Sequence, residues 1–183
     1  MPTGQLQLVL TKGGDRLDEL LAFGARANAK RGFLFVSKIL AKHWPVKPHV
    51  MRAVHDELAQ QIPALPGPIV FIAMAETGIG LGQGVFEAFL RQQPQSACLF
   101  LHSTRYPLDG CELFEFAETH SHAPRQYLHL PKDETLNRLF RSARSLVLID
   151  DEASTGNTFV NLARACCRYC PDLSHVHLAT GLR

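Results

Sequence analysis

Two neighbouring acids, Asp150 and Asp151, stand between an apolar run and a turn of small, mostly polar residues. The whole segment covers residues 146–158 and reads LVLIDDEASTGNT. An apolar run without alternation is typical of a strand that is covered on both faces, as in a parallel α/β sheet. Ligands of such sheets bind at the carboxyl ends of the strands. The pattern therefore predicts that both carboxylates face a ligand.

The turn after the acids has the composition of an anion-binding loop. It precedes a predicted helix, whose first backbone N–H groups have no partner within the helix and attract negative charge. Carboxylates in turn accept hydrogen bonds from sugar hydroxyls. The segment thus predicts a site for a phosphorylated sugar. An ordinary strand–turn–helix is the alternative, but it does not explain two acids directly after a buried strand, where desolvating charge is costly.

This segment resembles the signature of the type I phosphoribosyltransferases, enzymes that bind phosphoribosyl pyrophosphate (PRPP). The resemblance implies that Asp150 and Asp151 hold the ribose hydroxyls and favour the positive charge that develops on the ribose. The following loop would hold the 5′-phosphate through Ala153, Ser154, Thr155, Gly156, Asn157 and Thr158. It also implies a transfer of ribose 5-phosphate to a small nucleobase-like acceptor with release of pyrophosphate, in which Mg²⁺ is bound largely by substrate oxygens.

A glycine-rich turn, residues 73–82 with the sequence AMAETGIGLG, follows a second apolar run and opens a predicted helix. Its G-x-G-x-G spacing differs from the dinucleotide fingerprint G-x-G-x-x-G. The resemblance implies that this is the pyrophosphate loop, in which family members often have a non-proline cis peptide bond. Ala75, Glu76 and Thr77 would then offer backbone N–H groups to pyrophosphate, with Gly78 beside them. A plain strand-to-helix turn is the alternative.

A long excursion, residues 102–125, lies between these two segments, and loops of this length are uncommon unless they are functional. The resemblance implies a lid that closes over PRPP and brings a basic residue to the leaving pyrophosphate. Arginine suits bidentate phosphate contacts and histidine titrates near neutral pH. The excursion has no lysine, and Leu113, Phe114 and Phe116 indicate a β-hairpin. The candidate catalytic residues are Arg105, His120, His122 and Arg125; the alternative for the two histidines is an ordinary solvated loop.

The fourth segment covers residues 28–38 and reads NAKRGFLFVSK. Together with residues 42–46 (KHWPV), it resembles the N-terminal hood of a phosphoribosyltransferase subgroup found with tellurium-resistance and stress-response gene clusters. Phe33 and Phe35 could stack on a base, and Ser37 or Lys38 could contact its polar edge or a phosphate. A core strand with solvated flanking charges explains the same pattern equally well.

The remaining elements fit around these segments as one α/β domain of 183 residues with 46% hydrophobic content. Apolar runs at 69–74, 96–101, 146–149 and 175–179 predict strands that alternate with helices, and residues 48–62 have helical spacing. We expect a central parallel sheet flanked by helices, the Rossmann-like core of the type I phosphoribosyltransferases, with a lid hairpin. The hood would lie largely within residues 1–60 and the core within 61–183.

Composition limits the other function classes. The net charge is +2, and the sequence contains neither a polybasic run, nor a signal peptide, nor an apolar stretch of membrane-spanning length. We therefore expect a cytoplasmic protein without a nucleic-acid or membrane partner, and the resemblance implies a homodimer. Cys166 and Cys170 share an apolar helix face with Phe159 and Leu162. That spacing favours packing over a structural metal site, for which His175 or His177 would be the nearby ligands.

Two other function classes are compatible with the same signature. A non-catalytic regulatory module could bind PRPP or a nucleotide and lack a working base pocket. A hydrolase of nucleotides or phosphosugars is the third class. No nucleophile–base pair in the sequence indicates a covalent intermediate.

Overall fold

The computed structural model describes residues 7, 9, 16–25, 32–42, 44–117, 125–153 and 155–182. The chain divides into two compact units, Met1–Val54 and His55–Arg183, and the boundary falls within helix α2. In chain order the elements are α1 (Leu17–Leu20), β1 (Leu21–Ala25), β2 (Phe33–Ser37), α2 (Pro48–Gln60), β3 (Ile69–Ala73), α3 (Gly78–Gln92), β4 (Cys98–Thr104), β5 (Leu113–Ala117), β6 (Arg125–His129), α4 (Glu134–Arg141), β7 (Ser145–Glu152), α5 (Asn157–Cys167) and β8 (His175–Leu182).

The first unit contains an antiparallel pair of strands, β1 and β2, in which Leu21 lies opposite Ser37. Alternation along the two strands places Phe23, Phe33 and Phe35 in contact. Their ring centroids lie 5.7 Å apart for Phe23 and Phe35 and 5.4 Å apart for Phe33 and Phe35, both in edge-to-face geometry. The apolar run of the fourth segment is therefore a strand that presents aromatic rings on one face.

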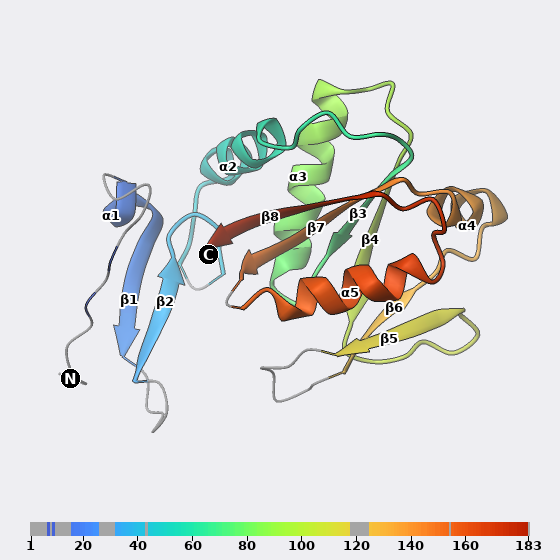
Figure 1. Ribbon diagram of the computed structural model, residues 1–183. Coiled ribbons are helices and arrows are strands. Elements are labelled where there is room, and N and C mark those ends of the chain that lie inside the picture. Colours follow the sequence, from blue (N-terminus) through green and yellow to red (C-terminus); the bar gives the residue numbers. More distant parts are fainter. Residues whose placement is uncertain are drawn as a thin grey trace. The chain divides into compact units, whose positions relative to one another are not determined.

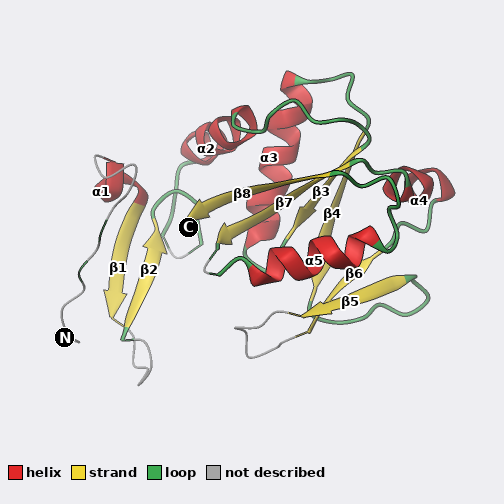
Figure 2. Ribbon diagram, viewed as in Figure 1, coloured by secondary structure: helices red, strands yellow, loops and turns green. Residues whose placement is uncertain are grey.

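The second unit is built on a sheet with the strand order β5-β6-β4-β3-β7-β8 among the described residues (Figures 1 and 2). Strands β4, β3, β7 and β8 are parallel, which confirms the predicted parallel core. Strands β5 and β6 form a hairpin that joins β4 in antiparallel orientation. The sheet is therefore mixed, because the predicted lid hairpin extends it at one edge instead of lying apart from it.

Helices cover both faces of this sheet because its central strands carry apolar side chains on both faces. All five residues of β3 are buried. Phe71 packs against Phe86 and Phe89 of α3, with ring centroids 5.2 and 5.0 Å away. Val70 and Ile72 point to the opposite face and belong to one core cluster with residues of α4 and α5. The result is a three-layer α/β/α arrangement, with α3 on one side and α4 and α5 on the other (Figure 1).

Helix α4 was not predicted from the sequence, although it has a clear start signal. The Asp133 carboxylate accepts hydrogen bonds from the backbone N–H groups of Thr135 and Leu136, both at 2.9 Å. This is a helix N-cap, which contributes about 1 kcal/mol. Near the other end of the helix, Arg141 donates to both carboxylate oxygens of Glu112 at 2.7 and 2.8 Å, which fixes the segment before β5.

Two of the cysteines on and after α5 act as small apolar residues, whereas Cys167 is exposed. Cys166 and Cys170 are fully buried in the core cluster with Phe159 and Leu162, as the spacing predicted. Burial raises the pKa of the Cys170 thiol to about 11, so this thiol is protonated at neutral pH. Its Sγ lies 3.2 Å from the carbonyl oxygen of Phe140 and donates a hydrogen bond to it.

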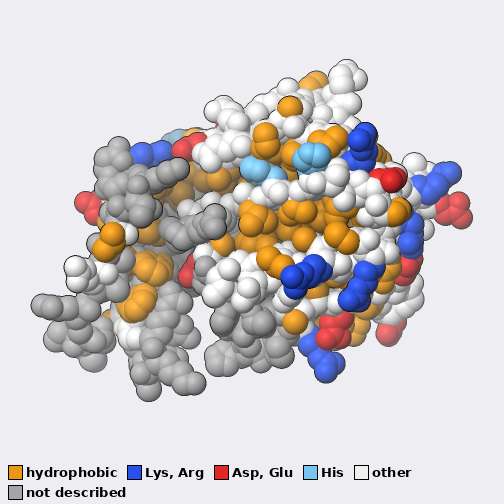
Figure 3. Space-filling model, in the orientation of Figure 1, with side chains coloured by type: hydrophobic (Ala, Val, Ile, Leu, Met, Phe, Trp, Pro, Cys, Tyr) orange, Lys and Arg blue, Asp and Glu red, His pale blue; other side chains and the backbone are white. Residues whose placement is uncertain are grey.

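One surface of the second unit is notably apolar. Hydrophobic side chains gather over α5 and β8 on the face shown in Figure 3. Val160, Val176 and Leu178 are 46, 47 and 43% exposed there. Among the described residues, no helix combines the length and hydrophobicity that crossing a membrane requires.

The close approach of α3 to the sheet gives a test of the fold. A Cβ atom at Gly82 would overlap the Cβ atom of Ala73, whereas a Cβ atom at Gly80 meets open space. We expect Gly82→Ala to lower the free energy of unfolding by about 1–3 kcal/mol through overpacking. The matched variant Gly80→Ala should raise it by about 0.5–1 kcal/mol through helix propensity. Urea unfolding measures both values, and shifts of the same sign would contradict this packing.

Candidate functional site

The glycine-rich turn and the acidic segment meet at the carboxyl ends of β3 and β7. These strands are paired in parallel with Ala73 opposite Ile149, so the two loops leave the sheet side by side. The Thr77 hydroxyl donates a hydrogen bond of 2.9 Å to the Asp151 carboxylate. Gly78 lies so close to Asp150 that a Cβ atom there would come within 2.9 Å of its Oδ1 atom. The two predicted loops therefore form one continuous surface.

The acid pair is part of strand β7, which continues through Glu152. Asp150 is half-buried and Asp151 is 8% exposed. Desolvation of these carboxylates is offset by local donors. Asp150 accepts a hydrogen bond of 2.9 Å from the backbone N–H of Asp151, and Asp151 accepts the one from Thr77. The carboxylates are thus held in place before any ligand binds.

The loop after the acids leads directly into α5, as predicted. Ala153, Thr155, Gly156, Asn157 and Thr158 are described, and Ser154 lies outside the described residues. Gly156 has a φ of 76°, in the left-handed region that favours glycine, and it is the N-cap of α5. The Asn157 N–H donates to the Thr155 hydroxyl at 3.4 Å. Since glycine has no side chain that could cap the next N–H groups of the helix, an anion could bind to them. That an anion binds there stays a prediction.

The glycine-rich turn has the cis peptide bond that the resemblance implied, between Ala75 and Glu76. Helix α3 begins at Gly78, three residues before the predicted start near Leu81. Glu76 and Thr77 are exposed, but Ala75 is buried and its N–H donates to the Ser103 hydroxyl at 2.8 Å. The Ala75 N–H thus has a hydrogen-bond partner inside the protein, as buried donors usually do. Its contact with pyrophosphate stays a prediction.

Two residues that the sequence did not single out hold this turn. Ser103 and Gln126 are 0 and 1% exposed, and the Ser103 hydroxyl donates to the Gln126 Oε1 atom. Gln126 belongs to β6, so a chain of hydrogen bonds connects the hairpin to Ala75. The only signal in the sequence was a polar residue at the end of an apolar strand, which has no specific meaning by itself.

The basic candidates of the excursion have different positions. Strand β4 continues to Thr104, so the excursion is shorter than predicted and Arg105 directly follows the strand. Arg105 is half-buried, and its Nη2 atom donates to the Ala75 carbonyl oxygen at 3.3 Å. The Arg125 side chain is 71% exposed and forms an ion pair of 3.4 Å with Glu115. His120 and His122 lie outside the described residues.

A histidine fixes the start of the excursion. The backbone N–H of Leu108 donates to the Nε2 atom of His129 at 2.9 Å. Burial, with a further contribution from His102, lowers the pKa of His129. Both observations agree, because Nε2 can accept this hydrogen bond only when it carries no proton. A neutral His129 thus holds the segment that follows Arg105.

The four predicted base-binding residues lie in the first unit. Phe33 and Phe35 are in contact, as described above, and Ser37 is 8% exposed at the end of the same strand. The ammonium group of Lys38 donates to the carbonyl oxygen of Asp18 at 2.5 Å. Both residues belong to the first unit. Binding of a base by these residues stays a prediction.

Comparison with known proteins identifies the family of the chain. A family model described as phosphoribosyl transferase matches residues 20–182. None of the curated proteins compared has a matching sequence.

Solved structures resemble the chain at low sequence identity. Adenine phosphoribosyltransferase from Rhodothermus marinus DSM 4252 is 12% identical with a TM-score of 0.54, over 91% of this chain and 83% of that one. The Trypanosoma brucei enzyme, in complex with AMP, pyrophosphate and ribose-5-phosphate, is 13% identical with a TM-score of 0.55, over 94 and 82%. The APRTase from Giardia lamblia, with 9-deazaadenine, is 14% identical with a TM-score of 0.54, over 91 and 94%. At these identities the likeness establishes the fold.

The buried hydrogen bonds around Ala75 give a test of the site geometry. In Ser103→Ala, the Ala75 N–H and the Gln126 side chain both lose a buried partner, so we expect the free energy of unfolding to fall by about 1–3 kcal/mol. The exposed Ser142→Ala is the control and should change it by less than about 0.5 kcal/mol. Chemical denaturation compares the two. Equal stability of both variants would show that the Ser103 hydroxyl does not hold the turn.

Proposed function

The chain belongs to the phosphoribosyl transferase family, and on that premise we propose that it transfers ribose 5-phosphate from PRPP to a nucleobase-like acceptor and releases pyrophosphate. The observation that carries the proposal is the junction of the two loops at the ends of β3 and β7. There the hydrogen bond from Thr77 to Asp151 joins the predicted pyrophosphate loop to the predicted ribose site. PRPP carries pyrophosphate and hydroxyl groups on one ribose, so a single molecule could contact both loops at this junction.

Each part of PRPP has a place in this proposal. Asp150 and Asp151 accept hydrogen bonds from the ribose hydroxyls. The loop 153–158 and the N-terminus of α5 bind the 5′-phosphate. Glu76, Thr77 and Gly78 bind pyrophosphate, and Arg105 lies against the same turn through its contact with Ala75. Ala75 anchors the turn through Ser103, and it is the fourth residue that we assign to the pyrophosphate loop.

The donor set at this edge suits Mg²⁺ that arrives with the substrate. The acids at the strand end offer oxygen atoms, which Mg²⁺ prefers. Among the described residues, no group of three or more His, Cys, Asp or Glu forms a protein metal site. Mg²⁺ usually combines one or two carboxylates with substrate phosphates, so Asp150 and Asp151 are the residues that would hold it. When bound, it would neutralise charge on the pyrophosphate.

The chemistry requires little from the protein beyond position and charge. A nitrogen of the acceptor attacks C1 of the ribose as the bond from C1 to pyrophosphate breaks. Pyrophosphate leaves with the electron pair, and the attacking nitrogen loses its proton. The carboxylates beside the ribose favour its developing positive charge, and the fixed loops keep the reacting atoms together.

The finer assignments rest on the resemblance alone. We assign the first unit to the hood, with Phe33, Phe35, Ser37 and Lys38 toward the base, and the chain to the subgroup found with tellurium-resistance and stress-response gene clusters. We also expect a cytoplasmic homodimer. Light scattering of the purified chain measures the mass of the assembly directly.

The ribose assignment makes a binding prediction. In the double variant Asp150→Asn/Asp151→Asn, hydrogen bonds from hydroxyls to charged acceptors are lost. We expect the Kd for PRPP to rise about 100-fold or more. The exposed Asp172→Asn controls for the loss of a carboxylate elsewhere and should bind PRPP as the wild type does. Isothermal titration calorimetry with Mg²⁺ present gives these values, and unchanged affinity in the double variant would reject the assignment.

An assay of pyrophosphate release distinguishes a transferase from a protein that only binds PRPP. Pyrophosphate release should occur with at least one member of a panel that contains adenine, other purines, orotate and unusual bases. A chain that binds PRPP but releases no pyrophosphate with any of them is the non-catalytic regulatory module. Pyrophosphate release without any base would indicate a hydrolase.

The two arginines of the excursion should differ in their effect on turnover. Arg105 lies at the pyrophosphate turn, so Arg105→Gln should lower kcat about ten- to a hundred-fold. Arg125 is on the surface in an exposed ion pair, and Arg125→Gln should change kcat less than about five-fold. Urea midpoints of both variants exclude a folding defect as the cause. Equal turnover in the two variants would remove Arg105 from the mechanism.

A further inference from the structure

The segment that carries Arg105 is held by hydrogen bonds on both sides of this residue. Before it, Thr104 is the last residue of β4, and its hydroxyl donates to the Tyr106 carbonyl oxygen at 2.6 Å. After it, the Leu108 N–H donates to the Nε2 atom of His129 at 2.9 Å. The backbone around Arg105 is therefore fixed by one contact within the segment and by one contact with strand β6.

The imidazole of His129 connects these two contacts. Its Nδ1 atom lies 3.5 Å from the Thr104 hydroxyl oxygen, a long hydrogen bond. A hydroxyl has one proton, and Thr104 donates it to Tyr106, so its oxygen can only accept from Nδ1. At the other side of the ring, Nε2 accepts from Leu108 and thus carries no proton. Together the contacts define one form of the ring, neutral and protonated on Nδ1.

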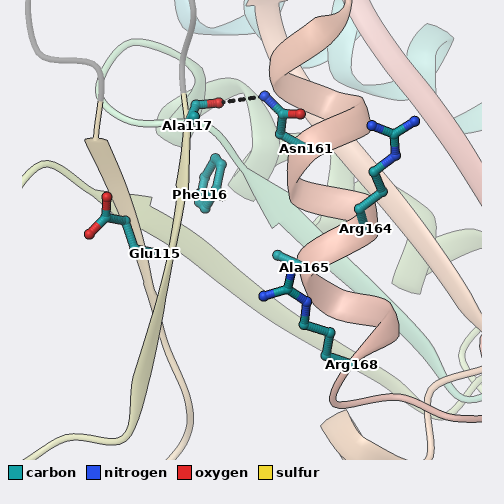
Figure 4. A pocket seen from close by; sticks show the side chains of 7 residues that line it. All are labelled: Glu115, Phe116, Ala117, Asn161, Arg164, Ala165 and Arg168. Carbon is teal, nitrogen blue, oxygen red and sulfur yellow. Dashed lines mark hydrogen bonds between the residues drawn. The ribbon is translucent and has the colours of Figure 1, made fainter.

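The ring is attached to a well-anchored part of the fold. His129 lies opposite Leu113 in the β5–β6 hairpin, and its neighbours Leu128 and Leu130 are 0 and 3% exposed. Strand β5 is in turn bound to α5, because the Asn161 side chain donates to the Ala117 carbonyl oxygen at 3.0 Å (Figure 4). His129 is therefore a fixed point from which the segment after β4 is held.

The surroundings of the ring favour its neutral form. Burial, and then the nearby His102 of β4, lower the pKa of His129 below the ordinary value of 6.5. The ring is therefore neutral at neutral pH, and it takes up a proton only as the pH falls through this lowered pKa. The other charged or titratable side chains on the elements around the ring are Arg105, Tyr106, Asp109, Glu112, Glu115, Tyr127 and Lys132.

We propose that neutral His129 is a positioning residue for Arg105, because it holds the backbone that keeps the guanidinium group against the Ala75 carbonyl oxygen. A proton on Nε2 would place two N–H donors, that of the ring and that of Leu108, against each other. The hydrogen bond would then be lost, and the segment after Arg105 would be released. The effect of this release on turnover rests on the proposed transferase function, whereas the position of Arg105 does not.

Nuclear magnetic resonance of the full chain tests the hydrogen bonds without any substrate. At neutral pH, long-range proton–nitrogen correlations should show His129 protonated on Nδ1. On acidification, the Leu108 amide and the Arg105 Nε–Hε signals should shift with the same pKa as the ring. Thr104→Val removes the acceptor of Nδ1 and should move the ring toward the Nε2-protonated form, whereas Thr104→Ser keeps the hydroxyl and should not. A wild-type ring protonated on Nε2, or an Arg105 signal that does not follow the titration, overturns the proposal.

Turnover gives a second test, in which a conservative variant separates the hydrogen bond from the rest of the side chain. His129→Gln brings an amide oxygen near the position of Nε2 and cannot take up a proton. Its kcat at neutral pH should stay within about two-fold of the wild type and should lack the wild-type decrease at acidic pH. His129→Ala has no acceptor and should lower kcat about five- to ten-fold. The exposed His175→Ala, on β8, is the control and should leave kcat unchanged.

A double variant shows whether His129 acts through Arg105. In the Arg105→Gln background, His129→Ala should lower kcat by less than about two-fold, because the residue that it positions is already absent. Effects that multiply in the double variant overturn the positioning role, and so does a His129→Gln variant with the wild-type acidic decrease. A wild-type chain without transferase activity rejects the proposed function instead, and the resonance measurements then decide alone whether His129 positions Arg105.

Discussion

The pairing of β3 with β7 is the constraint on which the candidate site depends. The two strands are parallel, in register from Ile69 and Ser145 to Ala73 and Ile149. Helices cover both faces of this pair, so the strands are buried almost throughout and neither can shift without exposing apolar side chains. Because they end together, the loops that follow them start side by side. The hydrogen bond between Thr77 and Asp151 is the direct result.

A second set of contacts makes the glycine-rich turn rigid from behind. Ser103 and Gln126 are buried polar residues whose hydrogen bonds are stronger in a dry environment than in water. Through them the hairpin strand β6 supports Ala75, and Arg105 contacts the carbonyl oxygen of the same residue. The hairpin is therefore a structural support of the turn as well as the base of the predicted lid.

Sequence patterns predicted the parts of the fold that depend on long apolar runs. The apolar runs at 69–74 and 146–149 lie in strands β3 and β7, because a central strand of a parallel sheet buries such a run on both faces. Helix α4 was missed because most of its residues are polar, although its Asp133 cap is visible in the sequence. The contact of Ser103 with Gln126 could not be predicted, since it arises only when β4 and β6 pair in antiparallel register. The hydrogen bond from the Ala75 N–H to Ser103 was also not predicted, because spacing along the chain does not show which N–H groups are buried.

The same strand order has a consequence for folding during synthesis on the ribosome. Strand β3 is made early, yet one of its two neighbours, β7, is synthesised only after α3, the hairpin and α4. Such distant pairings slow folding, because a long segment of chain must close into a loop before they form. A nascent or truncated chain that stops before residue 150 has no acid pair to place beside Thr77. The two loops of the candidate site can therefore meet only after β7 has been synthesised and has paired with β3.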